Sequence, residues 1–114
     1  LWQAKKLSQA RTYAQKAISF NENYGEPYIL LAQMYGSNPN WSDEPALNRC
    51  TYYVVIDKLQ RAKAVDPSVT DKVNELIATY ARHTPQAKDL FMLGYKAGDR
   101  ITIGGWIGES TTIR

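Results

Sequence analysis

Apolar residues recur three and four positions apart through most of the chain, and this spacing changes only near the C-terminus. The helical period predicts helices over 7–20, 27–36, 42–65 and 68–82, followed by a shorter one over 85–94. Further along, Ile101 and Ile103 lie two residues apart, as do Thr111 and Ile113, and Gly, Glu and Ser separate the two pairs. This alternation predicts a β-hairpin.

The segment GSNPNWSDEP, residues 36–45, is dense in Gly, Ser, Asn and Pro, so we expect a loop there. Ser42 is the expected N-cap of the long helix that follows, because its hydroxyl can accept a hydrogen bond from a first-turn amide. Asp66 and Pro67 are expected to end that helix. The inward face of the preceding helix is expected to carry Tyr28, Leu31, Ala32 and Tyr35.

Residues 17–35 return forty-five positions later as residues 62–80. Small, apolar and turn positions keep this offset throughout, so that Tyr35, for example, matches Tyr80. A fixed offset of this kind indicates one helix–turn–helix unit used twice. Stacked helical hairpins usually serve as binding scaffolds.

The repeated unit carries a more specific pattern in both of its helices. The first helix reads Tyr28-x2-Leu31-Ala32-x2-Tyr35 and Val73-x2-Leu76-Ile77-x2-Tyr80, and the second reads Val55-x3-Leu59-x2-Ala62. This resembles the tetratricopeptide repeat, in which small residues let antiparallel helices approach and large ones fill the gap to the next hairpin. The resemblance implies a mostly α fold, a tetratricopeptide-like α-solenoid of antiparallel helical hairpins with a short C-terminal β-hairpin.

The same resemblance implies a division of the chain. It places helical repeats in residues 1–97, with a partial first repeat over 1–24, a second with an insertion over 25–69 and a third over 70–97, and a β-hairpin cap in 98–114. The closing segment LGYKAGDRITIGGWIGESTTIR, together with the inserted long helix, looks like an uncharacterised family of tetratricopeptide proteins from Bacteroidetes-type bacteria. That likeness implies an exported protein of the periplasm or cell envelope and brings no established activity.

In tetratricopeptide arrays the first helix of each hairpin lines a concave groove. By that resemblance, the groove that takes a protein or peptide partner would be lined by Glu26, Ile29, Gln33, Asn74, Ala78 and Arg82. The family's clamp for an acidic C-terminus is not indicated, because Ile29 and Gln33 occupy places where it needs Lys and Asn. Two aromatic residues have no place in the repeat core. Trp41 is a candidate exposed contact, and Trp106 a candidate lid over the last repeat.

Composition and charge give no indication of a nucleic-acid partner or of a membrane-spanning helix. The chain has 114 residues, a hydrophobic fraction of 44% and a net charge of +3. Its basic residues alternate with acidic ones, so nucleic acid is not indicated as a partner. No apolar run reaches the roughly 20 residues that a membrane-spanning helix needs. The chain opens on Leu-Trp within a predicted helix and has no initiator Met, so we expect a piece of a longer protein.

Few residues are suited to catalysis. Cys50 is the only cysteine and His83 the only histidine, which excludes metal sites built on two histidines. A thiol–imidazole pair is possible in principle, but the expected places of the two residues at far ends of different helices favour a small buried thiol. We therefore expect no enzyme, no metal and no cofactor.

The sequence thus favours a non-enzymatic scaffold that binds a peptide or partner segment along its groove. Two alternatives stay open at this point. One is an assembly module of the cell envelope that self-associates through the edge of the C-terminal hairpin. The other is a glycan-binding module, suggested by the Tyr and Trp content alone.

Overall fold

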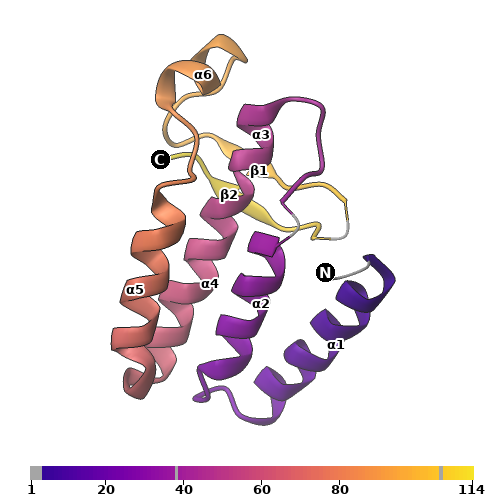
Figure 1. Cartoon of the computed structure of the whole chain (residues 1–114), viewed down its shortest axis with the longest axis vertical. Coiled ribbons are helices and arrows are strands. Elements are labelled where there is room, and N and C mark those ends of the chain that lie inside the picture. The colour runs from indigo at the N-terminus through magenta and orange to yellow at the C-terminus, as the bar shows by residue number, and fades with distance from the viewer. Residues whose placement is uncertain (1–3, 38, 106) are drawn as a thin grey trace.

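The computed structural model describes residues 4–37, 39–105 and 107–114, and it is mostly helical with a small antiparallel sheet at the C-terminal end (Figure 1). The helices are α1 (Ala4–Phe20), α2 (Glu26–Ser37), α3 (Pro45–Arg49), α4 (Thr51–Val65), α5 (Thr70–Ala81) and α6 (Ala87–Met92), with a 3-10 turn η1 (Pro67–Val69) before α5. The strands are β1 (Arg100–Thr102) and β2 (Ser110–Thr112). Each predicted helical span thus contains a helix, with differences given below, and the predicted hairpin is present.

The long helices pack in chain order, α1 on α2, α2 on α4 and α4 on α5. In Figure 1 each of them runs opposite to its predecessor. The core lies between them, and it includes all four residues predicted to face inward from the second helix, namely Tyr28, Leu31, Ala32 and Tyr35. Helical periodicity found these four positions but not the rest of the buried surface, since α2 also buries Pro27, Ile29 and Met34.

Two contacts show how α2 lies relative to α5. Near the first turns of both helices, Glu26 Oε2 lies 3.2 Å from Lys72 Nζ. Near their last turns, the Tyr80 ring covers Gly36 so closely that a Cβ on this glycine would lie 2.7 Å from the ring. Since the N-terminal ends meet and the C-terminal ends meet, α2 and α5 lie side by side and run in the same direction.

The turn between α1 and α2 is fixed against the end of α4. Gly25 N donates a 2.9 Å hydrogen bond to Asp66 Oδ2, and a Cβ at Gly25 would lie 2.9 Å from Asp66 Cβ. Asp66 also caps η1 by accepting from Ser68 N at 3.1 Å. The hydrogen bonds from Ser68 and Gly25 lower the pKa of Asp66, because they favour its ionised form. Only a residue without a side chain fits at position 25.

The predicted long helix is wrong in its first part. It is broken at Cys50 into α3 and α4, and Ser42 is not its N-cap, since α3 is capped by Glu44 without a side-chain hydrogen bond. The loop before α3 is held by the Asn48 side chain, whose Oδ1 accepts from the amides of Trp41 and Ser42 at 2.9 and 2.8 Å. These bonds fold the loop back over α3, a constraint that local helix propensity does not contain.

The hairpin packs against α4. Ile101 pairs with Thr111 in its register, and the side chains of Ile101, Ile103, Ile107 and Ile113 belong to the core. Thr111 Oγ1 donates to Asp57 Oδ2 at 2.7 Å, and Asp57 also forms an ion pair with the Arg114 guanidinium. The C-terminal segment is therefore part of the folded core.

Trp41, the candidate exposed contact, lies partly inside the fold. Its side chain is half-buried and covers the hairpin, where a Cβ on Gly104 would lie 3.0 Å from the indole. The indole Nε1 donates to the carbonyl of Leu47 at 3.1 Å. The Trp41 indole is thus held in place by a hydrogen bond and packs on the backbone of Gly104. The lid predicted for Trp106 lies outside the described residues.

Candidate functional site

An apolar groove of about 460 Å3 lies between α1 and α2. From α1 it is lined by Tyr13, Ala14 and Ala17, from the connecting turn by Tyr24, and from α2 by Glu26, Pro27, Ile29, Leu30 and Gln33. The two small alanines explain the hollow, because they leave space between the helices that larger side chains would fill. Along its edges Tyr13 is 76% exposed and Leu30 is 39% exposed. Exposed large apolar groups around a hollow are typical of binding surfaces.

The groove brings together three of the six residues predicted to bind a partner. Glu26, Ile29 and Gln33 all line it, although Ile29 is only 1% exposed and forms its floor instead of its edge. The Glu26 carboxylate pairs with Lys72 beside the groove. The lining of the groove is thus mostly apolar, and its one charged group, Glu26, is paired with Lys72. Gln33 supplies a polar side chain for hydrogen bonding.

The other three predicted residues, Asn74, Ala78 and Arg82, belong to α5 or follow it directly, and all are exposed. Asn74 Oδ1 accepts a 3.1 Å hydrogen bond from Lys63 Nζ of α4. Positions two apart on a helix are about 200° apart around its axis, so Asn74 points away from Lys72 and from α2. The six residues therefore do not line one hollow.

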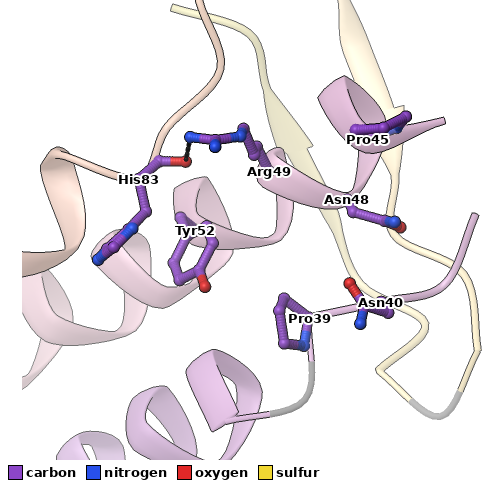
Figure 2. Close-up of a pocket in the computed structure, with 7 residues that line it drawn as sticks. All are labelled: Pro39, Asn40, Pro45, Asn48, Arg49, Tyr52 and His83. Carbon is purple, nitrogen blue, oxygen red and sulfur yellow. Dashed lines mark hydrogen bonds between the residues drawn. The ribbon is translucent and has the colours of Figure 1, made fainter.

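A second hollow, of about 360 Å3, has a mixed polar and apolar lining and lies where the loop before α3, α3 itself and the start of α4 meet (Figure 2). Figure 2 shows Arg49 reaching the backbone of His83, whose carbonyl accepts from Nη1 at 3.5 Å, with the Tyr52 ring below. The ring of His83 lies 5.2 Å from that of Tyr52. Asn48, also in the lining, has its side-chain oxygen and nitrogen bonded to the loop backbone. One polar side chain of the lining, Asn48, thus holds the loop in place.

A cluster of ionisable groups lies inside the fold. The Tyr35 hydroxyl donates to Glu109 Oε2 at 2.5 Å and accepts from Arg11 Nε at 2.9 Å. Lys58 Nζ lies 2.8 Å from Glu109 Oε1. Burial, followed by the Glu109 carboxylate, raises the pKa of Tyr35 well above its usual range, so the phenol keeps its proton and acts as a donor. Tyr35 is fully buried, and the cluster ties α1, α2, α4 and the hairpin together.

Cys50 is a buried thiol, as predicted. Its Sγ donates to the carbonyl of Ala46 in the preceding helical segment at 3.6 Å, and burial raises its pKa to about 11. A thiol with a raised pKa is a poor nucleophile at neutral pH. His83, by contrast, is exposed after the end of α5.

No protein-family model, curated protein or solved structure matches this chain. Among the described residues, no helix combines the length and apolar character needed to cross a membrane. The same part of the chain contains no group of three or more His, Cys, Asp or Glu side chains placed to hold a metal ion.

Sequence reasoning missed Tyr13, Tyr24 and Leu30, the exposed apolar residues of the groove. A signal for Tyr13 was present, since the apolar face predicted for the first helix runs through Ala10, Ala14 and Ala17 and leaves this tyrosine off it. A large aromatic residue outside the buried face of an amphipathic helix has no folding role. Leu30 likewise follows the buried Ile29 and falls on the solvent side of α2.

Proposed function

We propose that the protein is a non-enzymatic interaction module that docks a partner's apolar segment, most simply an amphipathic helix, in the groove between α1 and α2. The observation that carries this proposal is the exposure of Tyr13, Tyr24 and Leu30 around a hollow with small alanines at its base. A partner helix presenting side chains at positions i, i+3 and i+4 would place them between these residues. Tyrosines suit this role, because they give large contact area at a low entropic cost.

We further propose a tetratricopeptide-like array as the setting of the groove. Three observations support this interpretation: the repeat of residues 17–35 at 62–80, the shared direction of α2 and α5, and the tight Gly36–Tyr80 contact. In such an array each helix is covered by neighbours on both sides, and the groove is the side of α1 and α2 that a further helix would cover. The exported or envelope location suggested by resemblance belongs to the same proposal.

The groove is preferred over self-assembly through the hairpin because the hairpin's apolar side chains already serve the core. Its strands are three residues each, and Ile101 and Ile113 are buried against the helices. An edge this short offers few backbone hydrogen bonds to another chain. Deletion of residues 98–114 is therefore not a clean test of self-association through the hairpin edge, because it would also remove side chains of the core.

Selection from a library of random peptides displayed on phage tests the proposed function. We expect enriched peptides to carry bulky apolar residues at helical spacing. We expect Leu30→Asp to weaken their binding by about thirtyfold, because a buried anchor contact is worth about 2 kcal/mol. Fluorescence anisotropy with the enriched peptides measures the change. Leu30 is partly exposed, so far-UV circular dichroism of the variant should match the original.

Phe20→Asp provides the matched control. Phe20 is 88% exposed on the same pair of helices but does not line the groove, so this variant should bind the selected peptides normally. If no peptide motif is enriched, or if Leu30→Asp binds the enriched peptides as tightly as the original protein, the proposed function is wrong.

A further inference from the structure

A second apolar hollow lies at α6, at the far end of the molecule from the turn that joins α1 and α2 (Figure 1). It measures about 420 Å3, with Leu90 and Ile113 buried at its base. Phe91 and Met92 line it as well, yet they are 75% and 84% exposed. Such short helices usually turn their large apolar residues inward, so two adjacent exposed ones are unexplained by the fold.

The rim of this hollow is basic. Lys88 and Lys96 line it together with Arg114. Asp57 forms an ion pair with Arg114, whereas neither lysine pairs with a carboxylate anywhere in the described parts of the chain. Asp99 lies nearby and its Oδ2 accepts from the backbone amide of Lys96 at 2.9 Å, but neither it nor any other Asp or Glu side chain lines the hollow. Two lysines without an ion-pair partner among the described residues thus stand at the edge of an apolar floor.

We propose that this hollow, bounded by Phe91, Met92, Lys88 and Lys96, is a second docking site and that it takes an acidic peptide segment carrying bulky apolar side chains. The apolar side chains fill the space over Leu90 and Ile113, and flanking Asp or Glu side chains pair with the two lysines. A concave floor favours a peptide over a bilayer, because the side chains of a peptide can enter a hollow that a flat membrane surface would bridge. The site differs from the α1–α2 groove in its charge, so the two grooves select different partners.

Fluorescence anisotropy with a labelled synthetic peptide tests this site. The peptide repeats the heptad Leu-Glu-Glu-Leu-Leu-Glu-Glu, and the comparison peptide has Lys in place of every Glu. We expect the acidic peptide to bind, the basic one to bind at least about tenfold more weakly, and the affinity for the acidic one to fall as salt is raised. Equal binding of both peptides, or no binding of the acidic one, overturns the proposal.

Two double variants locate the binding. The double variant Phe91→Ala, Met92→Ala removes the apolar edge, and the double variant Lys88→Glu, Lys96→Glu reverses the charge of the rim. Each should lower the affinity for the acidic peptide by about tenfold or more. These side chains are exposed, so the fold is retained. Lys16→Glu with Arg61→Glu gives the same change of net charge at exposed positions elsewhere and should have a much smaller effect. If either of the first two variants binds like the original, the site is not here.

Other occupants give distinct results. The protein could instead bind vesicles of phosphatidylcholine and phosphatidylserine through Phe91 and Met92 and fail to bind the acidic peptide. That result would identify a membrane, and not a peptide, as the occupant of the hollow. Self-association that is lost in the Phe91→Ala, Met92→Ala variant would replace it with a second copy. The Leu30→Asp variant should bind the acidic peptide normally, which separates this test from that of the α1–α2 groove.

Discussion

Replacing Glu109 with alanine is expected to lower the free energy of unfolding by about 3 kcal/mol, a large share of the stability of a domain this size. The Glu109 carboxylate accepts a 2.5 Å hydrogen bond from the buried Tyr35 hydroxyl and lies 2.8 Å from the Lys58 ammonium. Alanine would remove this charged acceptor from a buried donor, and breaking such a bond costs more than the bond itself contributed. Chemical denaturation followed by far-UV circular dichroism measures the loss.

Glu109→Gln is the matched control for this prediction. Glutamine keeps an oxygen that can accept from Tyr35 and gives up only the charge, so we expect it to lose less than half as much stability. The ion pair with Lys58 is partly exposed and therefore contributes little by itself. If alanine and glutamine destabilise the protein equally, the hydrogen bond to Tyr35 is not what fastens the hairpin to the helices.

Gly25→Ala is expected to lower the free energy of unfolding by about 2 to 3 kcal/mol. The added methyl group would lie 2.9 Å from both Asp66 Cβ and Val69 Cγ2, and 3.0 Å from the carbonyl oxygen of Ala62. The backbone oxygen cannot move aside without disturbing the end of α4. The turn must shift instead, which also stretches the hydrogen bond from Gly25 N to Asp66 Oδ2. Thermal and chemical denaturation both report this change.

Asn23→Ala in the same turn provides the comparison. Asn23 is exposed, so its replacement should change the free energy of unfolding by less than about 0.5 kcal/mol. If Gly25→Ala is as mild as Asn23→Ala, the turn does not pack against α4 in the way the structure describes.

The sequence could predict those parts of the fold that are determined by residues close together in the chain. Helices appear as apolar positions three and four apart, and the hairpin as a change to a period of two, because each element buries one face. This is why the four inward positions predicted for α2 and the hairpin near the C-terminus were correct. The repeat at a fixed offset also indicated that two helices, α2 and α5, are equivalent, and they do run in the same direction.

The parts that it could not predict depend on contacts between distant segments. Tyr35 and Glu109 are 74 positions apart, and no local pattern joins them. The bonds of the Asn48 side chain to the loop join positions six and seven apart, and a helical period does not reveal them. The sequence shows that Tyr13 lies off the apolar face of its helix, but its place beside α2 depends on how two helices pack, and so the groove was only half predicted.

The most direct test of the docking groove is a nuclear magnetic resonance titration of the isotope-labelled protein with a peptide enriched in the display selection. We expect the amide signals to change most at Tyr13, Tyr24, Leu30 and Gln33, around the hollow between α1 and α2. Largest changes on α5 or around α6, with the signals of these four residues unmoved, would contradict it.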